Sequence, residues 1–285
     1  MTVTFLATSM SAIAASYMPF VLGTASGDSV SAATSSATAS LKENGFEIVG
    51  SYHPNADATI IVVTNQKLKT MASKSKNGGF GAMERVSIVN RGGSVEVSYT
   101  NPTYQWNMYR MKGDISSIQS AMEKALGNQK QFGAEQALSV DEIRGYHYKF
   151  MMPYFDDVDE LMDHDSHAIA LDVVEKNLSA NKAGGSKVYR IDIPNSEMTV
   201  FGVAIANGDG ADKTILKLID AKGNSHAAHL PYEILVNGKD VIALNAKFRI
   251  AINWPSLSMM GEGSFMSIAD SPNAITDVLT EISSE

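Results

Sequence analysis

Apolar and polar positions follow the same order in two stretches of the chain. Residues 47–64 read as a strand, a turn at Pro54-Asn55 and a second strand rich in β-branched side chains. Residues 187–205 repeat this order around Pro194-Asn195, and a helical segment that contains lysine follows each stretch. A fixed order of elements around matching Pro-Asn turns predicts one supersecondary unit that occurs twice.

The hydrophobic periodicity predicts the same succession of elements in both halves, namely strand, helix, two strands, helix, hairpin and helix. In the first half the predicted strands are residues 17–22, 46–52, 59–64, 84–90 and 94–100, and the predicted helices are residues 29–44, 67–76 and 115–126. In the second half the predicted strands are residues 148–155, 187–193, 198–205, 232–236 and 241–252, and the predicted helices are residues 158–178, 212–218 and 273–282.

Helices interspersed with hairpins predict an α+β fold, in which each half forms a mixed β-sheet covered by helices. At 285 residues the chain is long for one core, so we predict two similar domains. Their expected limits are residues 16–127 and 146–285, with a linker at residues 128–145 that holds a short helix at residues 139–144. Two copies of one unit in a single chain favour a pseudo-dimer.

The charge and the cysteine content exclude several classes of function. The formal net charge is -8, and no clustered basic face is visible, so we expect no nucleic-acid partner. The chain has no cysteine, which excludes disulfides, thiolate metal sites and a cysteine nucleophile.

The beginning of the chain resembles an export signal. The first 27 residues carry no charged side chain, and an apolar run ends in Ala12-Ile13-Ala14-Ala15, where signal peptidase would find small side chains. We therefore predict a signal-peptide remnant at residues 1–15 and a periplasmic or extracellular protein. Because the basic segment of a signal is missing, a buried first strand is the alternative. The run is too short and too rich in Ser, Thr and Ala for a membrane-spanning anchor.

Two pairs of histidines are candidate metal ligands. His164 and His167 are spaced to converge on one ion if their segment is helical, and the acidic residues around them would otherwise complement the dipole of the helix. His226 and His229, followed by Glu233, have a similar spacing, although the adjacent Leu-Pro favours a loop. Imidazoles suit Zn or Cu, so either metal is a candidate cofactor, while none is required.

Aromatic and methionine side chains gather in two loops, one after Asn101-Pro102 and one beginning at Trp254-Pro255, which we treat as equivalent. The candidate ligand-binding residues are Tyr104, Trp106, Tyr109, Arg110, Arg249, Trp254, Met259 and Phe265. They could line an apolar cleft between the halves, with the arginines placing charge beside it. The alternative is that these side chains pack the two domains together and leave no cleft.

The chain resembles a tandem repeat of the domain of unknown function (DUF) 302 family. In the first half the likeness is carried by Gly45-Phe46-Glu47-Ile48-Val49 and by a Val-rich hairpin that closes on Asn101-Pro102. In the second half it is carried by Thr199-Val200-Phe201-Gly202 and by the hairpin that closes on Trp254-Pro255. The resemblance implies an α+β domain that commonly pairs as a dimer, and it supplies no catalytic residues.

No motif in the sequence specifies a reaction. There is no Gly-x-Ser-x-Gly elbow and no phosphate-binding loop. We therefore expect a non-catalytic module that binds a small ligand or a protein partner, or that assembles through its sheet edges into oligomers or filaments. The alternative is a Cu or Zn carrier, or a metal-dependent enzyme, that uses the two histidine pairs.

Overall fold

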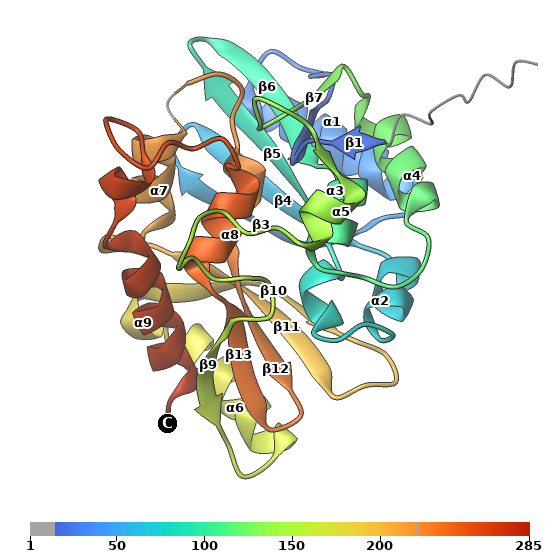
Figure 1. Cartoon of the computed structure of the whole chain (residues 1–285). Helices are drawn as coiled ribbons and strands as arrows, with labels where there is room; N and C mark the ends of the chain where they lie inside the picture. Colours follow the sequence, from blue (N-terminus) through green and yellow to red (C-terminus); the bar gives the residue numbers. More distant parts are fainter. Residues whose placement is uncertain (1–14, 221) are drawn as a thin grey trace, which may run out of the picture.

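A computed structural model describes residues 15–220 and 222–285, and the chain folds as α+β (Figure 1). Two antiparallel sheets lie one above the other, and helices cover the outer face of each (Figure 1). The predicted signal remnant lies outside the described residues except for its last residue. No helix in the described ranges is long and apolar enough to cross a membrane.

The first sheet has six strands, and two helices cover its outer face. The strands are β2 (Phe20–Leu22), β3 (Glu47–Asn55), β4 (Ala58–Thr64), β5 (Glu84–Arg91), β6 (Ser94–Thr100) and β7 (Lys130–Phe132). The helices are α1 (Val30–Glu43) and α4 (Ser116–Leu126). The spatial order is β3-β4-β5-β6-β2-β7. The predicted linker is therefore not a free connection, because it contributes β7 to this sheet.

The second sheet has five strands and a matching pair of outer helices. The strands are β9 (Val158–Asp163), β10 (Gly185–Asp192), β11 (Met198–Ile205), β12 (Tyr232–Asn237) and β13 (Asp240–Leu244). The helices are α6 (His167–Ser179) and α9 (Ser271–Ser283). The spatial order is β10-β11-β12-β13-β9.

Five strands of each sheet follow the same order. In both halves the first strand lies at one edge of these five and the second at the opposite edge, so α1 or α6 must cross the face of the sheet to join them. Neighbouring strands of the two sheets pair in antiparallel register throughout. The prediction of a mixed sheet is wrong. The strands that α1 joins, and those that α6 joins, run parallel to each other but lie at opposite edges of the five strands, so they do not pair.

The two crossing helices bury the same pattern of side chains. Ser29 caps α1, and buried side chains follow it at every fourth residue, namely Ala33, Ala37 and Leu41. Ser166 caps α6, and the same spacing gives Ala170, Val174 and Leu178. Residues four apart share one face of a helix, so each helix lays a narrow apolar stripe on its sheet. The predicted start of α6 at residue 158 is wrong, because residues 158–163 form β9.

Shorter elements connect these layers. They are β1 (Ser16–Tyr17), α2 (Gln66–Ala72), η1 (Gly78–Gly81), α3 (Pro102–Met108), β8 (Leu138–Ser139), α5 (Val140–Arg144), η2 (Lys182–Gly184), α7 (Asp212–Ile219), η3 (Ala227–His229), α8 (Ala246–Asn253) and η4 (Phe265–Ile268). Two predictions are wrong here. Residues 148–155 form no strand, and the strand predicted at residues 241–252 ends at Leu244, after which Asn245 caps α8.

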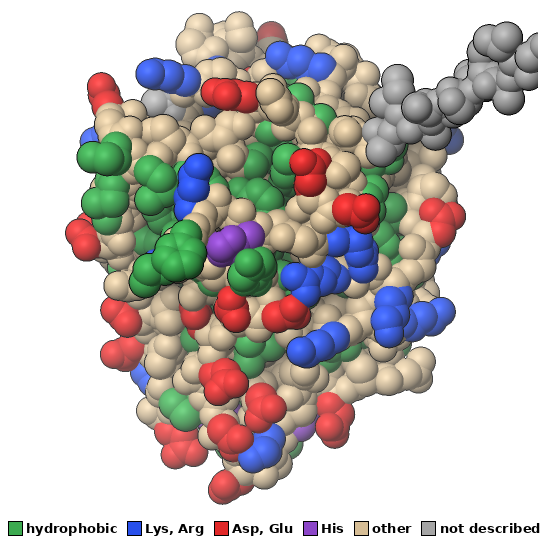
Figure 2. Space-filling model, in the orientation of Figure 1, with side chains coloured by type: hydrophobic (Ala, Val, Ile, Leu, Met, Phe, Trp, Pro, Cys, Tyr) green, Lys and Arg blue, Asp and Glu red, His purple; other side chains and the backbone are tan. Residues whose placement is uncertain are grey.

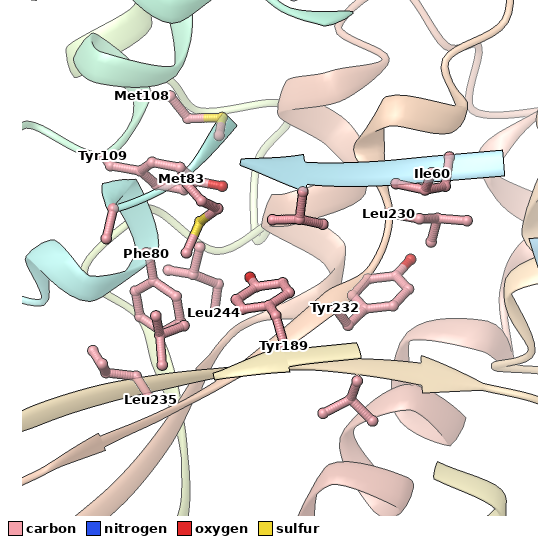
Figure 3. Close-up of a cluster of buried hydrophobic side chains, with 14 of the residues drawn as sticks. Ile60, Phe80, Met83, Met108, Tyr109, Tyr189, Leu230, Tyr232, Leu235 and Leu244 are labelled. Carbon is pink, nitrogen blue, oxygen red and sulfur yellow. The ribbon is translucent and has the colours of Figure 1, made fainter. Parts of the chain in front are cut away.

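The inner faces of the two sheets share one core. Figure 3 shows Tyr189 and Leu235 of the second half pointing toward Ile60 and Tyr109 of the first, so the space between the sheets is filled by side chains from both. The edge strands β3 and β10 approach each other at Gly50, where an added Cβ would lie 2.4 Å from the carbonyl oxygen of Val188. Only glycine permits this approach.

Candidate functional site

A buried charged cluster lies between the two sheets. Glu233, the second residue of β12, forms ion pairs with Arg85 of β5 and with Arg249 of α8. The Nε and Nη2 atoms of Arg249 lie 3.1 and 3.0 Å from the Glu233 carboxylate. All three side chains are almost fully buried, with 1–2% of their surface exposed. Although burial opposes the charge on Arg85, the attraction of Glu233 raises the pKa of the guanidinium.

His229 completes this cluster as a neutral ring. Arg249 donates to His229 Nδ1 at 3.2 Å and to the His229 carbonyl oxygen. Nε2 therefore carries the proton and donates to the Tyr232 hydroxyl at 3.0 Å. Burial, and then repulsion by Arg249, lowers the pKa of His229. Both ring nitrogens of His229 have a partner within the protein, so the ring offers no free lone pair to a ligand.

A second buried contact links β3 to α7. The Tyr52 hydroxyl donates to Asp212 Oδ2 at 2.9 Å, and the Ile205 N–H donates to the same oxygen. Burial raises the pKa of Asp212 to about 7, although both hydrogen bonds favour the ionised carboxylate. Since Tyr52 and Asp212 belong to different halves, this hydrogen bond holds α7 against the first sheet.

A groove of about 650 Å³ lies between the two halves. One wall consists of the turn between β3 and β4 and the end of β5, and the other wall consists of α7, which lies beside these strands in Figure 1. Ala58 and Val89 contribute apolar surface from the first half, and Leu216 and Ala227 contribute it from the second. The volume falls within the range of small-molecule sites, which commonly form where two units meet.

Three basic and two acidic side chains line the groove. Lys213 and Lys217 are exposed on α7, one turn apart, and form no hydrogen bond or ion pair with any described residue. Arg91 also lines the groove and lies 3.1 Å from Asp220. Asp57, on the opposite wall, is exposed and has no cationic partner in the described ranges. The net charge of the chain is -8, whereas the basic side chains of the groove outnumber its acidic ones.

Asp220 also lines the groove. Its carboxylate accepts hydrogen bonds from Arg91, from Ser225 Oγ at 2.6 Å and from the His226 N–H at 2.8 Å. Burial raises the pKa of Asp220 to about 6, while these donors oppose the shift. The arrangement compensates the charge of Asp220 within the protein, which leaves the two lysines as the free charges of α7.

The aromatic residues predicted to bind a ligand are largely core residues. The buried members of this set are Tyr104, Trp106, Tyr109, Arg249, Trp254 and Phe265. The Tyr104 hydroxyl donates to the Ile252 carbonyl at 2.7 Å, which ties α3 to α8. Arg110 pairs with Asp156, and Met259 is half-buried against the core. The expected cleft between aromatic loops is wrong, since these side chains pack the halves together.

The two loops are also not equivalent. Asn101 follows the last hairpin strand of the first half and begins α3. The residue in the same place in the second half is Asn245, which begins α8, whereas Trp254 follows that helix. The Trp-Pro pair matches the Asn-Pro pair only if residues 246–252 continue the strand, and they form a helix instead.

The four candidate metal ligands do not converge. His164 follows β9 and lies 3.0 Å from the Ser283 carbonyl, while His167 begins α6 and contacts the Gly238 carbonyl at 2.9 Å. His226 stacks on Trp254, and burial lowers its pKa to about 4. No group of three His, Asp or Glu side chains that could hold an ion occurs in residues 15–220 and 222–285. The geometry therefore does not support the predicted metal site.

The sequence contained a signal for the buried cluster but none for the groove. Arg85 and Glu233 interrupt apolar strands at their second residues, and a charge inside such a strand indicates a buried partner. Lys213 and Lys217 look like ordinary surface lysines, because the other wall of the groove lies more than 100 residues away in the sequence.

Comparison of the chain with protein-family models, with curated proteins and with solved structures finds no match. The resemblance to the DUF302 family therefore stays a prediction that depends on short motifs.

Proposed function

We propose that the protein is a non-catalytic module that binds a small ligand in the groove between its two halves. The observation that carries the proposal is the position of the groove, whose walls come from the β3–β4 turn, the end of β5 and α7. Neither half alone would form it. The buried cluster around Glu233 and the hydrogen bond between Tyr52 and Asp212 keep these walls in place, which favours binding to a largely pre-formed site.

The similarity of the two halves supports an origin by gene duplication. The identical order of five strands and the matching stripes on α1 and α6 fit a pseudo-dimer of two DUF302-like units that share a core. On this proposal the pseudo-dimer is already complete within one chain, and further oligomerisation is not needed to form the groove.

We also propose that the protein acts outside the cytoplasm. The uncharged first 27 residues and the Ala12-Ile13-Ala14-Ala15 sequence support an export signal. Mass spectrometry of the N-terminus of protein from its native source tests this proposal. A mature chain that begins near Ser16 agrees with it, and an intact Met1 contradicts it.

The binding proposal is tested by screening small molecules for an increase in melting temperature, because a ligand that binds only the native state stabilises it. The decisive variant is Thr214→Trp, which places a large side chain in the groove from α7. Ser120→Trp is the matched control, because it adds the same side chain to the exposed face of α4.

Compounds that stabilise the wild type and the Ser120→Trp variant should lose their effect on Thr214→Trp. Equal stabilisation of all three proteins places the ligand elsewhere and contradicts the proposal.

A further inference from the structure

The groove contains two lysines that the fold leaves without partners. Lys213 and Lys217 lie four residues apart on α7, so they project from one face of the helix. Both are exposed and line the groove, where a carboxylate or hydroxyl of the protein could pair with them. These two make no such contact with any residue in the described ranges, although Asp57 and Asp220 also line the groove.

The corresponding helix of the first half provides a comparison. Helix α2 follows the third of the five strands of its half, as α7 does, and it carries Lys67 and Lys69. Lys67 donates to Ser117 Oγ, and Lys69 lies 3.5 Å from Glu47. The lysines of α2 are thus used within the protein, whereas those of α7 face a groove with their charges uncompensated.

The surroundings of these lysines define the chemistry of a ligand. Beside them lie Ala58, Val89 and Leu216, which offer an apolar surface. We propose, on the basis of the function proposed above, that the groove binds a small organic anion whose carboxylate or phosphate contacts Lys213 and Lys217 and whose apolar body lies against this surface. Arg91 also lines the groove, but its ion pair with Asp220 balances its charge.

Asp57 opposes the same anion from the other wall. It has no cationic partner among the described residues, so its charge should weaken anion binding. Asp57→Asn should therefore increase affinity, while Lys213→Gln/Lys217→Gln should reduce it. A mutation that only damaged the fold would not produce these opposite effects at one site.

The test uses four naphthalene compounds that differ in one group and share the apolar ring: 2-naphthoate, 2-naphthyl phosphate, neutral 2-naphthol and cationic 2-naphthylmethylamine. Binding to the full chain is measured by isothermal titration calorimetry at low and high salt.

Each lost lysine should weaken the binding of the two anions by about fivefold, and Asp57→Asn should strengthen it by about twofold to fivefold. Higher salt should weaken the anions, since exposed charges are screened. Lys42→Gln/Lys124→Gln, which removes two exposed lysines from α1 and α4, should have no effect.

Comparison of the carboxylate with the phosphate decides which anionic group the site prefers. Binding of the neutral and cationic compounds as tightly as the anions, still blocked by Thr214→Trp, would overturn the anion inference and leave the proposed function standing. Absence of binding by all four compounds would also overturn it, while the broader screen would still decide the proposed function.

Discussion

The replacement of Glu233 by glutamine should strongly destabilise the protein. Glutamine keeps the shape of the side chain but removes the negative charge that lies between the guanidinium groups of Arg85 and Arg249. Both arginines are almost fully buried and cannot regain water. Removing one partner of a buried ion pair costs about 3–5 kcal/mol. For a domain with a total stability of about 5–15 kcal/mol, this loss is large.

The free energy of unfolding is measured by urea denaturation, followed by circular dichroism and by tryptophan fluorescence. Trp106 and Trp254 report on the first and second halves, respectively. Because both halves share one core, the circular dichroism signal and the tryptophan fluorescence should change together in a single transition. Asp163→Asn is the control, since it removes an exposed ion pair with Lys239 and should change stability far less.

Arg85→Met, added to Glu233→Gln, should restore part of the lost stability, because it removes a buried charge that has lost its partner. A Glu233→Gln variant within about 1 kcal/mol of the wild type would refute the reasoning, and so would strictly additive effects of the two mutations.

Three further predictions concern the pH dependence and the packing. Asp212→Asn should flatten the pH dependence of stability. Burial raises the pKa of Asp212 to about 7, so the folded wild type keeps a proton that the unfolded chain releases near pH 4. The stability of the wild type should therefore fall as the pH rises from about 4 to 7. Urea titrations at several pH values check this, and parallel curves for the two proteins would count against it. Leu41→Ala and Leu178→Ala, at matching positions of α1 and α6, should each cost about 2–5 kcal/mol in the same assay; a negligible cost at either position would show that the two stripes are not equivalent. Gly50→Ala should cost about 1–3 kcal/mol, because its Cβ would collide with the Val188 carbonyl, and an unchanged melting temperature would mean that β3 and β10 separate freely.

The strands and their turns were predictable because their signals are local. Residues 58–64 form a continuous run of buried side chains, and the turn at Asn237-Gly238 joins β12 to β13 as expected. The repeat around the Pro-Asn turns likewise anticipated two sheets with one strand order. Because such patterns depend on a few neighbouring residues, the structures that they favour can be predicted from the sequence.

The errors occurred where tertiary pairing decides between two local preferences. Residues 158–163 are acidic enough to begin a helix, but they pair with β13 and form the edge strand β9. Residues 246–252 contain alternating apolar side chains, yet the side chain of Asn245 accepts a hydrogen bond from the Lys247 N–H and begins α8. In both cases the local sequence suits either structure, and a contact distant in the sequence or a capping residue selects one.

The candidate site was beyond prediction for a different reason. The groove combines α7 with residues 55–58 and 89–91, and only the packing of one half on the other brings them together. Aromatic side chains were predicted to bind a ligand, but residue identity does not distinguish an aromatic side chain of the core from one that binds a ligand. The most exposed large apolar side chains, Phe150 and Met151, lie outside the groove. Acidic side chains gather over β9 and α6 at the lower end of the face in Figure 2.

The location of a bound ligand tests the central claim most directly. Hydrogen–deuterium exchange, followed by mass spectrometry, should be compared for the full chain with and without saturating 2-naphthoate. The account predicts slower exchange in residues 55–58, 89–91 and 213–218, which form the two walls of the groove. If calorimetry shows that 2-naphthoate binds, slower exchange confined to other segments would contradict it.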